Sequence, residues 1–161
     1  MSDIIPLPHY PQSAEGLCLA ACARMVLAYW GTTTSEEELT ELLGIKNWGA
    51  PASAIQRLPR FSQREWDVDY GCGTLEDLRQ WLQNRMPVIV FVRTGFLEHW
   101  TTDVGHAVVV VGVTDEGVYI HDPAMTEAPT ALSITGFEAA WIEMDYSYAL
   151  IIPTAGEGQG D

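Results

Sequence analysis

Basic residues are few in this chain. Lysine and arginine together number 8 among 161 residues, against 22 aspartates and glutamates, so the formal net charge is −14 at pH 7. Because Lys and Arg supply most of the affinity of proteins for phosphate groups, this balance argues against nucleic-acid binding. A solvated acidic surface explains the charge, and recognition of a cationic peptide is the alternative.

Long apolar segments and a secretory signal are also missing from the sequence. The longest apolar runs, 88–92 and 107–113, fall far short of the roughly 20 residues that a membrane-spanning helix needs. The first residues, Met-Ser-Asp-Ile-Ile-Pro, show no basic region followed by an apolar core. We therefore expect a cytoplasmic protein with no membrane segment in this chain.

Cysteine is scarce, and its number is odd. Three cysteines in a chain without a visible signal do not indicate a disulfide framework, and one of them is a candidate working thiol. The plain interpretation of Cys18 and of Cys22, one helical turn further on, is a small core residue. Cys72 stands between two glycines, where we expect a loop without chemistry.

The hydrophobic period changes halfway along the chain. The first half predicts one short strand at 66–70 and helices at about 17–30, 35–44, 52–58 and 74–84. The second half predicts strands at 87–93, 106–114, 117–121 and 148–153, with a further helix before the last of them. A turn at 113–117 makes the middle two strands an antiparallel hairpin. Capping signals at the predicted helix starts are the pairs Ser35–Glu38, Thr74–Asp77 and Thr135–Glu138.

Helices in the first half and strands in the second predict an α+β domain. We expect one domain over 1–155, in which a helical lobe at about 12–85 packs on a sheet lobe at about 86–153. The glycine-rich tail at 156–161 is expected to be disordered. Any cleft should lie between the lobes, with Cys18 on the helical side and His106 on the strand side.

Four residues stand in an order that suits thiol catalysis. Cys18 opens a helix, whose unpaired amides favour a thiolate. His106 begins a stiff apolar strand and can hold the thiol proton, while Asp122 can orient the imidazole. A hairpin that turns near Glu116 would place His106 and Asp122, whose midpoint is position 114, at the ends of adjacent strands. Gln12 precedes Cys18 by six positions, and its amide can donate to a tetrahedral oxyanion.

Each of these residues also has a structural interpretation. A histidine at a strand end is more often structural than catalytic, Asp-Pro is a common turn, and a single glutamine is uninformative. Zinc binding through Cys18 and Cys22 is a further alternative, although two-cysteine zinc sites generally use the tighter Cys-x-x-Cys spacing. We predict no metal and no cofactor, and we assign no role to His9 or His99.

The ordered set resembles the papain-like peptidases that cut bacteriocin leaders after a double glycine, cysteine-peptidase family 39, and their stand-alone relatives. The resemblance extends over about 6–153, and its motifs are Tyr10-Pro11-Gln12, Cys18-Leu-Ala-Ala-Cys22, Gly105-His106-Ala-Val-Val-Val-Val-Gly112 and His121-Asp122-Pro123. It implies a papain-like fold with an N-terminal helical lobe packed on a C-terminal antiparallel sheet. It also implies Cys18 as nucleophile, His106 as general base, Asp122 as its orienting residue and Gln12 as oxyanion donor.

The chain departs from that family in two respects. Relatives usually carry Asp-Cys-Gly at the nucleophile, whereas this chain has Leu17-Cys18-Leu19, which puts a bulky side chain beside the thiol. No transmembrane domain follows, and no Gly-x-x-x-x-Gly-Lys-Ser/Thr motif of an ATPase occurs. The export role of the transporter-fused members is therefore not implied.

The sequence thus predicts a cysteine peptidase that cleaves a peptide or protein substrate through an acyl-enzyme intermediate, after small residues such as Gly-Gly. An inactive peptide-binding domain of the same fold is one alternative. Acyl transfer by the same triad is another, because hydrolysis and transfer share their first half-reaction. No partner protein other than the substrate is identified.

Overall fold

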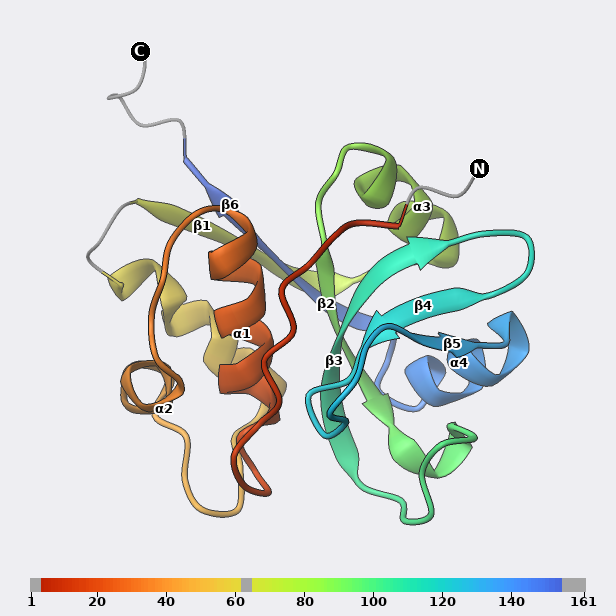
Figure 1. Cartoon of the computed structure of the whole chain (residues 1–161), viewed down its shortest axis with the longest axis horizontal. Coiled ribbons are helices and arrows are strands. Elements are labelled where there is room, and N and C mark those ends of the chain that lie inside the picture. Colours follow the sequence, from red (N-terminus) through yellow and green to blue (C-terminus); the bar gives the residue numbers. More distant parts are fainter. Residues whose placement is uncertain (1–3, 62–64, 155–161) are drawn as a thin grey trace.

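A six-stranded antiparallel sheet organises the computed structural model, which describes residues 4–61 and 65–154 (Figure 1). Its strand order is β1-β6-β2-β3-β4-β5. The strands are β1 (Trp66–Cys72), β2 (Val88–Arg93), β3 (Gly105–Val113), β4 (Val118–His121), β5 (Thr130–Leu132) and β6 (Ser147–Pro153). The tail at 156–161, predicted to be disordered, lies outside the described residues.

Helices lie on both sides of the central strands. They are α1 (Cys18–Tyr29), α2 (Glu36–Leu43), α3 (Leu75–Gln83) and α4 (Ile134–Ile142), with short 3-10 helices η1 (Ala52–Arg60) and η2 (Thr94–Phe96). In the view of Figure 1, α1, α2 and η1 lie to the left of β2 and β3, and α3 and α4 lie to their right. Helix α1 packs against β3 and β6, which brings its first residue to the start of β3.

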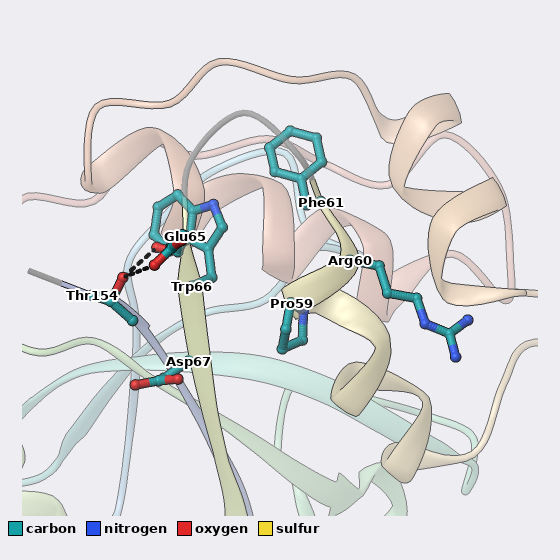
Figure 2. Close-up of a pocket in the computed structure, with 7 residues that line it drawn as sticks. All are labelled: Pro59, Arg60, Phe61, Glu65, Trp66, Asp67 and Thr154. Atoms are coloured by element: carbon teal, nitrogen blue, oxygen red, sulfur yellow. Dashed lines mark hydrogen bonds between the residues drawn. The ribbon is translucent and has the colours of Figure 1, made fainter. Parts of the chain in front are cut away.

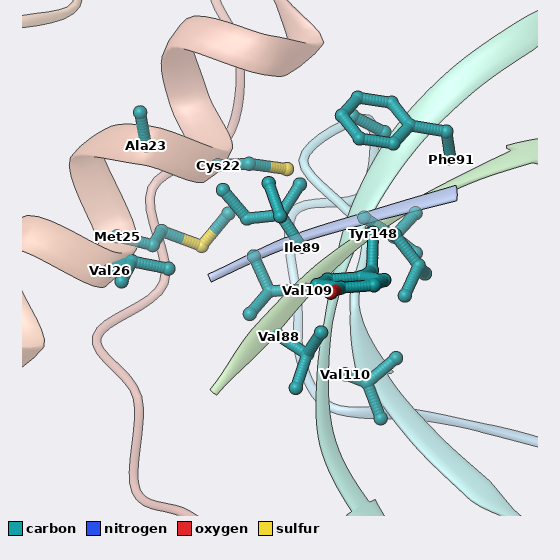
Figure 3. Packing of buried hydrophobic residues seen from close by; sticks show 14 of the residues in the cluster. Cys22, Ala23, Met25, Val26, Val88, Ile89, Phe91, Val109, Val110 and Tyr148 are labelled. Atoms are coloured by element: carbon teal, nitrogen blue, oxygen red, sulfur yellow. The ribbon is translucent and has the colours of Figure 1, made fainter. Parts of the chain in front are cut away.

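The core joins α1 to the two central strands. All of Val88–Val92 is buried, as is the run from His106 to Gly112, which agrees with the continuous apolar runs of the sequence. Figure 3 shows Cys22 and Met25 of α1 directed toward strand residues such as Ile89. Cys22 is fully buried in this cluster, where a small apolar side chain was expected.

The helix caps follow the sequence in part. At α3, Thr74 and Asp77 form the predicted reciprocal box. At α2, the Ser35 side chain accepts from the N–H of Glu38 at 3.0 Å. The Glu38 carboxylate, however, accepts a hydrogen bond from the hydroxyl of Thr34 at 2.8 Å, so the second half of that predicted box is missing.

At α4 the predicted cap is wrong by two residues. The helix begins at Ile134, and the Ser133 hydroxyl accepts from the N–H of Gly136 at 3.0 Å. The pattern Thr-x-x-Glu matched Thr135 and Glu138, but the true cap has a glycine at the third position and so carries no acidic marker. Strand β5, only three residues long, was not predicted, and β1 of the expected helical lobe pairs with β6 of the sheet.

The register of the β3–β4 hairpin differs from the register expected from the sequence, in which His106 is level with Asp122. Val109 pairs with His121 and Gly112 pairs with Tyr119, with a bulge between the two pairs. His106 lies three residues before Val109, so in the same register His106 is level with position 124 rather than with Asp122. Val113 pairs with Val118, so the hairpin turns after position 115 rather than at 114, and Asp122 therefore reaches His106 diagonally.

The N-terminal arm runs along the junction of α1 and the sheet (Figure 1). Ile5 is buried and its N–H donates to the carbonyl of Val111 at 2.9 Å. Further on, the N–H of Gln12 donates to the carbonyl of Pro123 at 2.7 Å. The arm is thus attached at both ends, and its second attachment places Gln12 beside the residues that follow β4.

Candidate active site

Cys18 is the first residue of α1, and its thiol meets the side chain of His106. Burial alone would raise the pKa of the Cys18 thiol. The hydrogen bond and charge of His106, together with the backbone N–H groups of Ala107 and Leu19, outweigh burial and bring that pKa below its ordinary value. The sulfur therefore lies where a thiolate is stabilised from both the helix and the sheet.

His106 connects the thiol to a carboxylate. Its side chain is 4% exposed, and Nε2 donates to Oδ1 of Asp122 at 2.7 Å, which leaves Nδ1 for Cys18. Burial lowers the pKa of His106, but the hydrogen bonds and charges of Asp122 and Cys18 prevail and raise it to about 9. At neutral pH this arrangement favours an imidazolium, held between a thiol of lowered pKa on one side and a carboxylate on the other.

The carboxylate of Asp122 is fully buried and accepts four hydrogen bonds. Oδ1 accepts from Nε2 of His106 at 2.7 Å and from the N–H of Ala124 at 2.9 Å. Oδ2 accepts from Nε2 of His99 at 2.7 Å and from Nε1 of Trp100 at 2.8 Å. Although burial raises the pKa of Asp122, the hydrogen bond and charge of His106 and the donors Trp100 and Ala124 hold it well below the usual range. The group is an anion with every lone pair engaged.

Gln12 lies at the same cavity as Cys18. Its Nε2 donates to the carbonyl of Ala14 at 3.0 Å, and its Oε1 is buried without a hydrogen-bond partner among the described residues. An amide nitrogen carries two hydrogens, so one of them is left for a bound group. The structure thus brings together all four residues that the sequence singled out.

A cavity of about 560 Å³ opens over the thiol. Its wall combines the end of the arm, the loop after α2 and the loop before β3; the lining residues are Gln12, Glu15, Gly16, Cys18, Leu19, Asn47, Trp48, Gly49, Ala50, Pro51, Trp100, Thr102, Val104, Gly105 and His106. Trp48 is 74% exposed, which is unusual for so large an apolar side chain. The predicted cleft between a helical side and a strand side is therefore present.

A second cavity, of about 450 Å³, lies at the start of β1 (Figure 2). It is lined by Pro59, Arg60, Phe61, Glu65, Trp66, Asp67 and Thr154. The Thr154 hydroxyl donates to the backbone carbonyl of Glu65 at 3.3 Å. This cavity contains none of the four candidate residues, so the site is assigned to the cavity over Cys18.

Leu19, the departure beside the nucleophile, is largely a core residue. It is 4% exposed and packs in the main hydrophobic cluster, although part of it lines the cavity. The expected bulky neighbour of the thiol is present, but most of its side chain points away from solvent.

Replacing Leu19 with alanine should lower the free energy of unfolding by about 3 kcal/mol, because it removes buried methyl groups and leaves a void. Urea unfolding followed by circular dichroism measures the change. The half-buried Leu42→Ala is the matched control and should cost clearly less. Equal losses in the two variants would show that Leu19 is not a core residue.

His99 and His9 carry contacts that sequence reasoning missed. His99 contacts Asp122, as described above, and His9 Nδ1 lies 3.2 Å from Nδ1 of His121. His9 Nε2 also lies 2.8 Å from the carbonyl of Met125. Both histidines stand in segments without hydrophobic periodicity, so no local pattern shows where these loops fold back.

The described residues contain neither a cluster of metal ligands nor a membrane-spanning helix. No group of three or more His, Cys, Asp or Glu side chains in 4–61 and 65–154 is arranged to hold a metal ion. Within the same residues, no helix combines the length and the apolar character that crossing a bilayer requires.

The chain is similar to a group of peptidases in sequence and in structure. A sequence model of the Peptidase_C39 like family matches residues 4–149, whereas no curated protein gives a significant match. A Bacillus anthracis protein described as a C39-like peptidase superposes with a TM-score of 0.77 at 19% identity, covering 96% of this chain and 98% of that one.

Two further solved structures are similar. The peptidase domain of Streptococcus ComA, a bi-functional ABC transporter involved in a quorum-sensing pathway, has a TM-score of 0.74 at 21% identity, covering 93% of this chain and 99% of that one. A double glycine motif protease from an AMS/PCAT transporter, in complex with the leader peptide, has a TM-score of 0.72 at 18% identity, covering 96% and 99%. At such identities the likeness concerns the fold, and the predicted α+β fold is confirmed.

Proposed function

The chain belongs to the Peptidase_C39 like family, and on that premise we propose that it is a cysteine peptidase working through Cys18, His106, Asp122 and Gln12. The contact of Cys18 with His106 is the main observation that supports this proposal. It pairs a thiol of lowered pKa with an imidazole whose pKa is raised to about 9. Two such groups in contact at the floor of an open cavity form an activated nucleophile and its acid–base partner.

The proposed reaction forms a thioester. The Cys18 thiolate attacks the carbonyl carbon of the substrate, and the oxyanion receives hydrogen bonds from the Gln12 amide and the backbone N–H of Cys18. The His106 imidazolium gives its proton to the leaving amine as the C–N bond breaks. Neutral His106 then takes a proton from water as the water attacks the thioester; the C–S bond breaks, and the acid and the Cys18 thiolate are released. Asp122 stays ionised throughout and keeps the imidazole oriented.

Cleavage after small residues such as Gly-Gly is the proposed specificity. Trp48 and Trp100 both line the cavity, and Gly16 and Gly49 bring two loops of its wall into close contact. A Cβ on Gly16 would lie 2.9 Å from the carbonyl of Asn47. A double glycine motif protease with a bound leader peptide is among the similar structures, which supports a peptide substrate.

A peptide library with varied residues before the scissile bond tests the specificity. We expect cleavage to concentrate after glycine and alanine, because bulkier side chains would collide with the walls of the cavity. Mass spectrometry of the products also separates the two alternatives. A free carboxylate shows hydrolysis, and a product joined to an added amine shows acyl transfer. Equal cleavage after small and large residues would contradict the proposed specificity. Binding of peptides without any product would favour the alternative of an inactive peptide-binding domain.

The rate of peptide cleavage should show a bell-shaped dependence on pH. Activity requires a thiolate and a protonated His106 together, so the rate should fall as pH rises through about 9, where His106 loses its proton. On the acid side the rate should fall only below the ordinary pKa of a thiol, because the pKa of Cys18 is lowered. Initial rates at low substrate concentration between pH 5 and about 10 measure both limbs. A rate that is still rising beyond pH 9 in a folded protein would contradict the assignment of His106.

A further inference from the structure

We propose that His99 is a positioning residue of this site, which as a neutral imidazole donates from Nε2 to Asp122 and thereby holds the carboxylate on His106. The inference rests on the proposed function of Cys18 and His106. It concerns a histidine whose side chain is 19% exposed and which contacts the one carboxylate that His106 uses.

The orientation of the Asp122 carboxylate depends on both of its oxygens. Oδ1 faces His106 and Ala124, and Oδ2 faces His99 and Trp100. Rotation of the carboxylate away from His106 would therefore break the bonds on Oδ2 as well. His99 and Trp100 are neighbours in the loop before β3, so one short segment supplies both of these donors. Without His99, Trp100 alone would have to hold that side of the carboxylate.

The hydrogen bonds also indicate which form of His99 is present. Nε2 lies 2.7 Å from a carboxylate oxygen and must therefore carry a hydrogen. Nδ1 is buried and has no hydrogen-bond partner within the described part of the chain. A second ring proton would leave an N–H without an acceptor, which is unfavourable in a buried place. His99 is thus a neutral donor in this arrangement.

A neutral donor suits the chemistry at His106. Asp122 interacts with the ionisable side chains of His99, His106 and Cys22, and Cys22 remains a thiol because burial raises its pKa well above the ordinary value. A cation at position 99 would compete with the His106 imidazolium for the same anion and disfavour the charged pair with Cys18. A neutral N–H orients the carboxylate, and the negative charge of the carboxylate then stabilises the His106 imidazolium without a competing cation.

Three variants of the full chain test the inference: His99→Leu removes the donor, His99→Gln keeps an N–H, and Thr101→Ala is an exposed, uncharged control in the same loop. The measurement is the rate at which iodoacetamide modifies Cys18, as a function of pH. We expect His99→Leu to lower the rate at pH 6.5 by about tenfold, the effect of one hydrogen bond to a charged group, and to shift the acid limb upward. His99→Gln and Thr101→Ala should retain most of the rate.

NMR of ¹⁵N-labelled histidine side chains provides a second readout, which does not require catalysis. His99 of the wild-type protein should show a neutral ring with hydrogen on Nε2 at pH 7, and the titration of His106 should shift in His99→Leu. An unchanged alkylation profile and His106 titration in His99→Leu would overturn the inference. Equally slow alkylation in His99→Gln and His99→Leu would also overturn the inference, because it would indicate that the side chain at position 99 contributes packing alone. If wild-type Cys18 shows no enhanced reactivity, the proposed function fails, and the His106 titration still decides the role of His99.

Discussion

Replacing Cys18 with alanine or serine should lower kcat/KM for peptide cleavage by at least about 10⁴-fold, because the reaction loses its nucleophile while binding and the oxyanion donors remain. Cys18 lies partly exposed at the cavity, with His106 beside it and two backbone N–H groups directed at the sulfur. Its alkylation by iodoacetamide should be the fastest of the three thiols, and His106→Ala should slow it at neutral pH.

The other two cysteines are the matched controls for this prediction. Cys22 is fully buried and its pKa is raised well above the ordinary value by burial, so it should resist alkylation in the folded protein. Cys72 is exposed, but no activating partner was expected from its position, and Cys72→Ser should keep full activity. Mass-spectrometric mapping of the first modified cysteine decides among the three. Rapid modification of Cys22 or Cys72 in place of Cys18 would show that the nucleophile has been misassigned.

The parts of the fold that could be predicted are those with local signals. The start of α3 follows from Thr74 and Asp77, which form a reciprocal box with each other whatever surrounds them. The strands β2 and β3 follow from their continuous apolar runs, since burial on both faces needs no alternation. Strand β5 has only three residues, which is too short for any period to be recognised. Its pairing with β4 depends on the tertiary structure.

The residues of the candidate site also differ in whether a local signal in the sequence predicts their place. Cys18 and His106 lie at the starts of regular elements, so a pattern along the sequence places them correctly near the cleft. His99 lies in a loop whose path depends on a bond with Asp122, 23 positions away. Neither its spacing nor its neighbours indicate that contact. The turn of the β3–β4 hairpin had a similar effect, because it lies after position 115, so that Asp122 is not level with His106.

Replacing Asp122 with asparagine should lower kcat/KM by about 10⁴-fold, since a carboxamide neither stabilises the His106 imidazolium nor fixes its tautomer. It should also reduce the free energy of unfolding, because the NH₂ group that replaces one carboxylate oxygen can accept from neither of the two N–H donors which that oxygen binds. Each buried donor left unpaired costs about 1–3 kcal/mol, so a loss of at least about 2 kcal/mol is expected.

The two effects of Asp122→Asn can be separated in one preparation. The folded fraction comes from urea unfolding, and the pH dependence of Cys18 alkylation reports the charged pair in the molecules that remain folded. Without the carboxylate, the pKa of His106 should fall from about 9 toward its ordinary value, since Asp122 contributes the largest upward effect on it. Cys18 would then need a higher pH to form the thiolate. Asp115→Asn, the same change at an exposed turn, should alter neither quantity. A folded Asp122→Asn protein with wild-type alkylation at pH 6.5 would mean that the Cys18–His106 pair does not depend on this carboxylate.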